Sequence, residues 1–233
     1  MNKQSNLYTV IYIVVLVAVV GAALAFTSMS LRDRQTANIN ADKMRQILAS
    51  LNITVDKSEI IPTFENVITE QLIVDNTGNI LEGNAFDINV ASEVKKPADE
   101  RRLPVYIAST EQGKAYILPV YGAGLWGPIW GYIALKDDAS TVYGAYFSHQ
   151  GETPGLGAEI EKPKFSNQFQ GKHLFKGEEL RPIAVVKNGQ KPSGDEDYVD
   201  GVSGGTITSK GVGAMIDDCL TPYANYLKTI RSK

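Results

Sequence analysis

The sequence predicts an α+β protein with one N-terminal transmembrane helix, followed by a single domain in which helices flank an antiparallel sheet. Three observations predict this class. A long apolar run lies near the amino terminus, several short β-branched and aromatic runs are separated by turn residues, and an apolar helical pattern closes the chain. With 43% hydrophobic and 21% charged residues among 233, the composition is that of an ordinary globular chain with room for one sizeable domain plus an appendage.

The amino-terminal region has the composition of a membrane helix. No charged residue lies between Lys3 and Arg32, and residues 7–27 are almost wholly apolar and long enough to cross a bilayer as a helix. We expect residues 1–6 to be a tail. A cleaved signal peptide is the alternative, because Lys3 could be its basic start and residues 23–25 read Ala-Leu-Ala, a small-residue cleavage pattern. The apolar run exceeds the usual length of a signal core, which favours the transmembrane helix.

A juxtamembrane stalk helix is expected over residues 28–52, because apolar residues recur at helical spacing from Thr36 to Leu51. The charged residues of this stretch indicate on which side of the membrane the following domain lies. Taken alone, the basic residues after the span favour a cytoplasmic domain, although long domains can translocate regardless of such counts and nearby aspartates dilute the charge. The basic residues are Arg32, Arg34, Lys43 and Arg45, and the aspartates are Asp33 and Asp42.

Residues 53–233 are predicted to form the folded domain. A short helix is expected from Pro62 to about Glu70, followed by paired strands around turns rich in Gly, Asn and Asp. The expected hairpins pair residues 72–74 with 80–81 and residues 103–108 with 115–120. Residues 129–135 and 142–148 are rich in β-branched and aromatic residues and are predicted to form the centre of the sheet, with 183–186 as a further strand.

The carboxyl end is predicted to be helical over residues 212–230, where apolar side chains recur on one face. Pro222 should kink or divide this helix, because proline removes a backbone donor and clashes with the preceding turn. No internal repeat or domain boundary is evident within residues 36–233, so a single α+β domain is expected.

Charge and composition exclude several kinds of partner. The formal net charge of -3 provides no basic field for a phosphate backbone, so nucleic acid is not an expected partner. Cys219 is the single cysteine and is expected to be a small buried hydrophobe. His149 and His173 are the two histidines, and neither has a partner at metal-ligand spacing, so we expect no metal site.

The first candidate site is the segment Tyr121–Gly131, which places both tryptophans among small residues. One interpretation is a bulge at the start of a strand with tryptophans in the core. The other is a ligand site, in which glycines let a flat aromatic ligand approach the backbone while Leu125 and Trp126 pack against its ring.

The second candidate is the segment 149–157, directly after a predicted strand. Its composition is typical of an ordinary turn. The alternative is a rigid loop in which the Glu152 carboxylate and the Thr153 hydroxyl face a polar ligand, together with the loop's backbone groups.

The third candidate is the segment 203–211, where glycines and hydroxyl residues precede a helix. Such a composition is typical of a helix N-cap. The same geometry also binds phosphate, because exposed N–H groups and the helix dipole favour an anion, and Lys210 adds a positive charge.

The run Asp200, Gly201, Val202, Ser203, Gly204, Gly205, Thr206 resembles the flavinylation motif Asp-x-x-Ser/Thr-Gly-Ala-Thr of proteins modified by a flavin transferase. Gly205 stands where alanine is usual. The segments Gly124–Gly127 and Glu152–Gly157 and the single amino-terminal span extend the likeness, so that nearly the whole chain looks like the C subunit of the sodium-pumping NADH:quinone oxidoreductase.

This resemblance implies that the domain binds FMN and that Thr206 carries it through a phosphodiester. Thr208 and Ser209 are the neighbouring hydroxyls that the motif passes over. Asp200 is then expected to serve recognition by the flavin transferase. The further residues expected to contact the flavin are Ser203, Gly204, Gly205 and Lys210 near its phosphate, and Leu125, Trp126, Glu152, Thr153, Leu156 and Gly157 near its ring.

The function implied by the resemblance is one-electron relay through this FMN, during NADH to quinone transfer coupled to sodium export. No side chain of this chain is expected to be catalytic, and the NADH site is expected on another subunit. The other subunits of the complex and the flavin transferase are the implied partners. The family places the flavin domain on the extracytoplasmic side of the bacterial inner membrane, against the charge count, and we follow the family.

Three alternatives have different sequence grounds. The G subunit of the Rnf ferredoxin:NAD oxidoreductase shares the anchor, the flavin domain and the acceptor motif. A membrane-anchored peptidase could use Ser203 or Ser209 activated by Lys210, although adjacent Ser209 and Lys210 generally point apart. An anchored, non-catalytic ligand-binding or assembly module is the third alternative.

Overall fold

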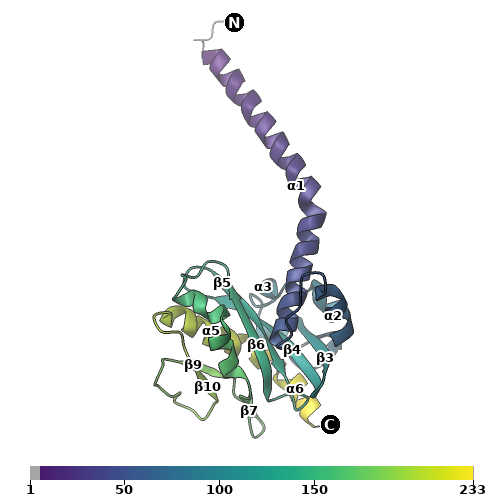
Figure 1. The fold of residues 1–233 in the computed structure, drawn as a ribbon, viewed down its shortest axis with the longest axis vertical. Coiled ribbons are helices and arrows are strands. Elements are labelled where there is room, and N and C mark those ends of the chain that lie inside the picture. Colours follow the sequence, from purple (N-terminus) through teal and green to yellow (C-terminus); the bar gives the residue numbers. More distant parts are fainter. Residues whose placement is uncertain (1–5, 233) are drawn as a thin grey trace. The chain divides into compact units, whose positions relative to one another are not determined.

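The computed structural model describes residues 6–232, which divide into two compact units, one ending at Lys43 and one beginning at Met44 (Figure 1). The tail expected over residues 1–6 lies outside the described residues except for Asn6, where the first helix begins.

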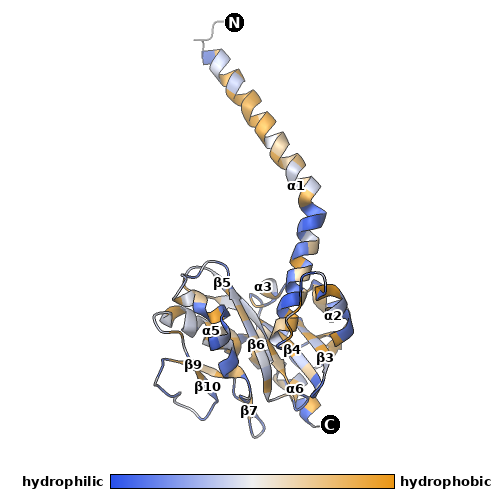
Figure 2. Ribbon diagram, viewed as in Figure 1, coloured by the Kyte–Doolittle hydropathy of each residue, from blue (hydrophilic) through white to orange (hydrophobic). Residues whose placement is uncertain are grey.

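The first unit is helical throughout its described residues. Helix α1 (Asn6–Ser50) runs without a break through the regions expected to be the span and the stalk, and its last seven residues belong to the second unit. Its first half is hydrophobic and is followed by a hydrophilic stretch, as Figure 2 shows. The apolar side chains of that half are exposed, and the helix is long and apolar enough to cross a membrane. An exposed apolar column of this length fits a membrane anchor.

The second unit is built around a six-stranded antiparallel sheet with the strand order β2-β1-β3-β4-β5-β6. The predicted hairpins are confirmed. The strands are β1 (Ile68–Val74), β2 (Ile80–Leu81), β3 (Leu103–Thr110), β4 (Gly113–Ala123), β5 (Pro128–Leu135) and β6 (Val142–His149).

The predicted sheet centre is wrong. Strands β3 and β4 occupy the middle, whereas β6 is an edge strand of this sheet. The sequence of β6 looks central because both of its faces are covered. Phe147 packs against Phe165 and Phe169 with ring centroids 5.5 and 5.0 Å apart, while Gly144 lies against the end of α1 near Ser50.

The sheet separates two hydrophobic clusters, because successive side chains of a strand point to opposite faces. Val105 and Ile107 belong to the cluster shared with the carboxyl-terminal helices. Tyr106 and Ala108 belong to the cluster shared with the end of α1 and with α2 (Ile60–Val67). The domain therefore has three layers with the sheet in the middle.

The expected helix around Pro62 begins and ends earlier than predicted. Pro62 lies in the first turn of α2, where its missing N–H is not needed, and β1 takes over from Ile68. The β-branched and apolar residues that follow favour the strand over a longer helix.

Short elements connect the main ones. They are η1 (Ala85–Asp87), α3 (Val90–Glu93), η2 (Ala98–Glu100), η3 (Gly157–Glu161), α4 (Pro163–Ser166), η4 (Asn167–Phe169), β7 (Phe175–Lys176) and β8 (Glu179–Leu180). The further strand predicted over residues 183–186 is confirmed as β9 (Ala184–Val186), and it pairs in parallel with β10 (Tyr198–Asp200), a strand that the sequence did not predict.

Pro222 divides the carboxyl-terminal helix, as predicted. Helix α5 (Thr206–Leu220) is followed by the 3-10 turn η5 (Thr221–Tyr223) and then by α6 (Ala224–Arg231). The predicted start near residue 212 was late by about two turns of helix, because the first turns of α5 are polar and carry the glycine-rich run.

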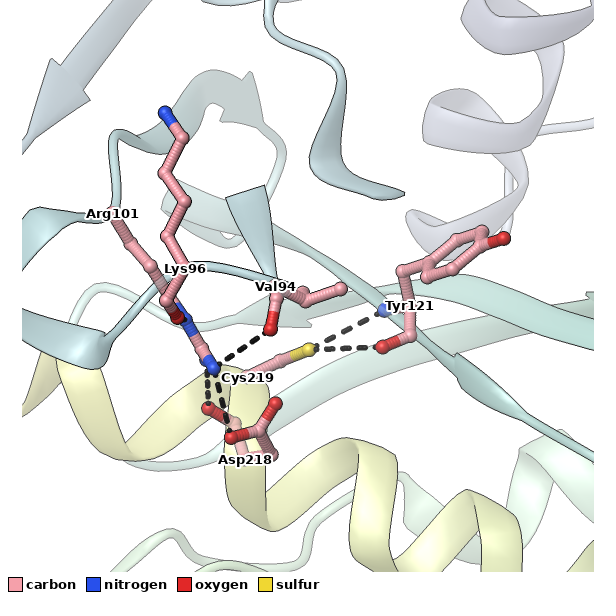
Figure 3. A network of polar contacts seen from close by, with 6 residues as sticks. All are labelled: Val94, Lys96, Arg101, Tyr121, Asp218 and Cys219. Carbon is pink, nitrogen blue, oxygen red and sulfur yellow. Dashed lines mark hydrogen bonds and ion pairs between the residues drawn. The ribbon is translucent and has the colours of Figure 1, made fainter. Parts of the chain in front are cut away.

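The end of α5 is fixed by Arg101, which is 8% exposed (Figure 3). Its guanidinium donates to the carbonyl oxygens of Val94, Lys96 and Asp218 at 2.9 to 3.0 Å and to the Asp218 carboxylate at 3.1 Å. Cys219, on the same turn, is buried as expected, and its thiol lies 3.4 Å from both the amide and the carbonyl of Tyr121 in β4. These contacts hold α5 against the sheet.

Candidate functional site

The glycine-rich run forms the loop between β10 and α5. The Gly201 amide donates to the Val186 carbonyl at 2.7 Å, which ties the loop to β9. Gln168 binds the backbone of Asp200 twice, accepting from its amide at 3.0 Å and donating to its carbonyl at 3.2 Å. The chain therefore enters α5 along a fixed path.

The hydroxyl residues of this region differ in accessibility. Ser203 and Thr206 are exposed. Thr208 is 1% exposed and donates its hydroxyl to the Glu152 carboxylate. Ser209 is 5% exposed, and its hydroxyl oxygen accepts a hydrogen bond from the Val202 amide at 2.9 Å. The hydroxyls of Thr208 and Ser209 are therefore buried and hydrogen-bonded to other groups of the protein.

The start of α5 departs from the expected side-chain cap. Gly205 is the N-cap residue, and no side chain caps it. Gly204 has a φ of +76°, the left-handed region that favours glycine, and a Cβ there would lie 2.6 Å from the Leu156 side chain. The glycines therefore serve close packing and an unusual backbone conformation. The first amides of α5 have no partner inside the helix, as in any helix, and no side chain caps them here.

Two hollows adjoin the loop. The first, which we name the Thr206 hollow, measures about 400 Å³ and contains Ser203, Gly204, Thr206 and Lys210 in its lining. The second, the Lys164 hollow, measures about 670 Å³, and Gly155, Glu159, Lys164 and Gln168 contribute to it. Residues Asn188, Gly201, Val202 and Ser203 line both.

The turn between β4 and β5 carries Leu125 and Trp126 at its tip. The Gly124 amide donates to the Gly127 carbonyl at 2.8 Å, which closes the turn. Leu125 is 47% exposed and Trp126 is 68% exposed, so the interpretation of Trp126 as a core residue is wrong. Trp130 is half-buried and donates its indole N–H to the buried Gln46 side chain at 3.0 Å.

Glu152 has a different environment from the one expected. Its side chain is only 4% exposed, and both carboxylate oxygens bind protein donors. One accepts from the Trp126 amide at 2.8 Å, and the other accepts from the Thr208 hydroxyl. Burial by itself raises the pKa of this carboxyl, but the hydrogen bonds from Thr208, Trp126 and Leu125 outweigh it and lower the pKa below its ordinary value. Glu152 is therefore an ionised structural link.

The rest of the 149–157 segment combines exposed and buried residues. Leu156 is 43% exposed and Thr153 is exposed, while Gly157 is buried. The Thr153 carbonyl accepts from the amides of Leu156 and Ala158, both at 3.1 Å, which makes the segment a tight turn into η3.

The structure thus brings most predicted site residues together, either in the lining of one hollow or by direct contact. Ser203, Gly204, Thr206 and Lys210 share a hollow, Gly205 packs against Leu156 and Gly157, and Trp126 connects to Thr208 through Glu152. Thr153 and Leu125 lie outside the linings of both hollows.

Sequence reasoning missed Gln168 and Lys164, which adjoin the Asp200 run. They lie more than thirty positions before that run, in short elements whose sequences carry no motif. Their placement depends on the packing of Phe165 and Phe169 beneath β6, which the sequence does not display.

The arrangement can hold a phosphate group and a flat ring. Thr206 begins α5 and Lys210 follows one turn later on the same face, so an anion beside the Thr206 hydroxyl meets the helix amides and a cation. Exposed Leu125, Trp126 and Leu156 offer apolar surface at the neighbouring turns.

Comparisons with known proteins identify the family of this chain. Residues 124–221, which contain all three candidate segments in whole or in large part, match the family model of the FMN-binding domain. The C subunit of the Na(+)-translocating NADH-quinone reductase of Vibrio anguillarum is 34% identical, over 93% of this chain and 91% of its own length. Its counterpart from Yersinia pestis is 33% identical, over 99% of this chain and 95% of its own length.

Solved structures extend the match to the fold. The crystal structure of the C subunit of the Na(+)-translocating NADH-quinone reductase from Parabacteroides distasonis is 48% identical, with a TM-score of 0.80, and the match covers 84% of this chain and 96% of that chain. NqrC of Shewanella oneidensis, at 24% identity and a TM-score of 0.70, shares the fold. The chain belongs to the family of the C subunits of the Na(+)-translocating NADH-quinone reductases.

Proposed function

We propose that this chain carries FMN covalently at Thr206 and relays electrons within a Na(+)-translocating NADH-quinone reductase. The observation that carries the proposal is the contrast among three hydroxyls. Thr206 is exposed at the start of α5 beside a hollow, whereas Thr208 and Ser209 are buried and bonded to protein groups. Family membership supplies the FMN and the electron-transfer role.

The attachment step requires an accessible hydroxyl. Thr206 attacks the FMN phosphorus of FAD, the P–O bond of the pyrophosphate breaks, AMP leaves, and the hydroxyl proton is lost to solvent. A flavin transferase catalyses this step. Gly204 and Gly205 add no side chain beside the acceptor, and Asp200 serves recognition by the transferase.

The residues around Thr206 fit the attached group. The amides at the start of α5 and the Lys210 ammonium hold the phosphate, while Ser203, Gly204 and Gly205 shape its surroundings. Exposed Leu125, Trp126 and Leu156 would contact the ring, with Thr153 and Gly157 at the same turn. Buried Glu152 would support them through its hydrogen bond with the Trp126 amide. Bound flavin supplies reversible electron transfer, and its protein surroundings tune the potential.

The chain is a membrane-anchored subunit in this proposal. We assign residues 1–6 to a tail, 7–27 to the span, 28–52 to the stalk and 53–233 to the FMN-binding domain, with the domain outside the cytoplasm. As in the family resemblance, the NADH site belongs to another subunit. The sodium path also lies elsewhere, because the uncharged span suits an anchor and not an ion path.

In-gel flavin fluorescence tests the proposal. The full chain is expressed with and without a flavin transferase, run on a denaturing gel and illuminated to excite flavin. We expect a fluorescent band from the wild type with the transferase, none from Thr206→Ala, and a retained band from Thr208→Ala. A dark wild-type band would overturn the flavin proposal, and fluorescence in Thr206→Ala would overturn the site.

The alternatives have less support. The relatives are named as C subunits of the reductase, so the Rnf G subunit is not favoured. The peptidase alternative requires a serine activated by Lys210. Ser209 is buried and engaged with the Val202 amide, while Lys210 is exposed, so this pair does not form a nucleophile and base. A dark wild-type band would leave a non-catalytic module as the remaining candidate.

A further inference from the structure

The Glu152 carboxylate joins two segments of the candidate site that lie far apart in the sequence. The Trp126 amide at the β4–β5 tip donates to one oxygen at 2.8 Å. The Thr208 hydroxyl, 56 residues further along the chain from Glu152, donates to the other. The amide of Glu152 itself donates to the His149 ring nitrogen at 3.1 Å, which ties the backbone of Glu152 to the end of β6. Three separate elements therefore meet at one residue.

Two glycines make room for this carboxylate. A Cβ on Gly124 would lie 3.0 Å from the carboxyl carbon of Glu152, and its contact with the nearer oxygen would be closer still. A Cβ on Gly157 would meet the other oxygen and would also lie 2.5 Å from the Thr208 hydroxyl oxygen. Neither glycine has a positive φ. Glycine is therefore required at both positions because Glu152 and Thr208 lie too close for a side chain, and not because of the backbone conformation.

The first turn of α5 therefore has one side bonded to Glu152 and one side exposed at the candidate site. Thr208 lies on the buried side, where Glu152 holds it, and Thr206 lies on the exposed side. The same carboxylate fixes the amide of Trp126, whose side chain is exposed at the tip. A displacement of Glu152 would therefore move the tip relative to Thr206.

We propose that Glu152 is a positioning residue that links the Leu125–Trp126 tip to the first turn of α5, and so fixes the surroundings of a flavin attached at Thr206. We call this link, formed by the hydrogen bonds from the Trp126 amide and the Thr208 hydroxyl to Glu152, the clasp. This inference rests on the proposed function. Glu152 makes no contact with the flavin in this account. It acts through the Trp126 amide and the Thr208 hydroxyl, both of which bind its charged oxygens and are correspondingly strong donors.

The two possible roles of Glu152, as a ligand contact or as the clasp, predict different effects of substitutions at Thr208. If Glu152 faced a ligand, removing the Thr208 hydroxyl would leave the tip in place. In a clasp, Thr208→Val leaves one buried carboxylate oxygen without its donor and loosens the link, whereas Thr208→Ser retains the donor. Glu152→Gln is the corresponding conservative change at the other end, because its amide oxygen can accept from Trp126 and its NH₂ can donate to Thr208.

The first measurement follows the tip without flavin. Trp126 and Trp130 are the two tryptophans, so Trp130→Phe leaves Trp126 as the sole tryptophan reporter. In the full chain in detergent, with no transferase, we expect Glu152→Ala and Thr208→Val to lower the fluorescence anisotropy of Trp126. Thr208→Ser and Glu152→Gln should retain it. Unchanged anisotropy in Thr208→Val, with a lower Tm, would reduce Glu152 to a stabilising residue and overturn the clasp.

The second measurement follows the flavin itself. In protein flavinylated by the transferase, we expect Thr208→Val to keep the flavin on Thr206 while lowering flavin anisotropy and shifting the midpoint potential, with Thr208→Ser restoring both. Equal anisotropy and potential in all variants would overturn the positioning role. Absence of flavin from the wild type would instead overturn the proposed function, and with it the claim that Glu152 positions a flavin. The Trp126 measurement needs no flavin and therefore tests the clasp independently.

Discussion

Thr206 and Thr208 lie on the same first turn of α5 and have opposite environments. Thr206 is exposed beside a hollow of about 400 Å³. Thr208 is 1% exposed and donates its hydroxyl to the buried Glu152 carboxylate. Because residues two positions apart on a helix face in different directions, one turn can both anchor itself in the core and present a free hydroxyl. This division leaves Thr206, and not Thr208, accessible for the flavin attachment that we propose.

The departure from the usual motif at Gly205 leads to a first prediction. A Cβ at Gly205 would lie 3.2 Å from the Gly157 amide nitrogen, the Leu156 carbonyl carbon and the Val202 Cβ. We expect Gly205→Ala to lower the free energy of unfolding by about 1 kcal/mol, because overpacking outweighs the smaller entropy of the unfolded chain. Flavinylation should persist.

Urea denaturation of the full chain in detergent, together with in-gel fluorescence, measures both effects. Gly151→Ala is the matched control, since a Cβ there meets nothing within 4 Å. An equal stability change in the two variants would contradict the packing argument, and loss of fluorescence in Gly205→Ala would show that this position controls modification.

The second prediction concerns stability in acid. Asp197 accepts hydrogen bonds from the Lys176 ammonium and the His173 amide, both at 2.7 Å. Burial raises the pKa of its carboxyl, but these bonds outweigh burial and lower the pKa to about 2 from an ordinary value of 3.8. Ionised Asp197 therefore stabilises the fold above that ordinary value, and the contribution is lost as the pH falls toward 2.

We expect the free energy of unfolding to fall between roughly pH 4 and pH 2, and to fall less steeply in Asp197→Asn. Denaturant titrations across this range measure the slopes. Asp195→Asn, at an exposed neighbouring position, serves as control. Parallel curves for the wild type and Asp197→Asn would refute the assignment.

A third prediction tests what holds α5 in place. Arg101→Ala leaves the carbonyl groups of Val94, Lys96 and Asp218 without this donor. Since each unpaired buried polar group costs about 1–3 kcal/mol, we expect a loss of about 3 kcal/mol in unfolding free energy. Arg102→Ala removes one bond to the Glu82 carbonyl and should cost about 1 kcal/mol. Thermal denaturation of both variants compares them, and a similar Tm would count against the Arg101 network.

The fourth prediction concerns membrane orientation. Cys219 is 4% exposed, and burial raises the pKa of its thiol to about 11, so it should not react with maleimides near neutral pH. Glu111→Cys places a thiol on the exposed turn between β3 and β4. A membrane-impermeant maleimide should label this variant, but not the wild type, in intact cells with a permeabilised outer membrane. Labelling that requires lysis of the inner membrane would place the domain in the cytoplasm.

Most elements could be predicted because their signals are local. Turn residues at 75–79 and 111–113 mark the hairpins, and Pro222 marks the break between α5 and α6. The position of β6 could not be predicted this way. Its apolar residues indicate burial on both faces, but whether a strand has one hydrogen-bonded neighbour or two depends on distant segments.

The candidate site could be predicted as a set of segments, but not as a set of contacts. The glycine-rich run identifies the start of α5, yet nothing local distinguishes the exposure of Thr206 from that of Thr208. Burial of Thr208 depends on Glu152, which is 56 residues away in the sequence. For the same reason Glu152 looked like a ligand contact, because the donors that occupy its oxygens lie on other elements.

The mass of the tryptic peptide of residues 188–210 tests the central claim most directly. Trypsin cuts after Lys187 and Lys210, while Lys191 precedes proline and resists cleavage, so the peptide contains Ser203, Thr206, Thr208 and Ser209 together. Protein made with the flavin transferase should yield this peptide heavier by FMN less one water, with the fragment ions placing the addition on Thr206. An unmodified peptide, or an addition on Ser203, Thr208 or Ser209, would contradict the account.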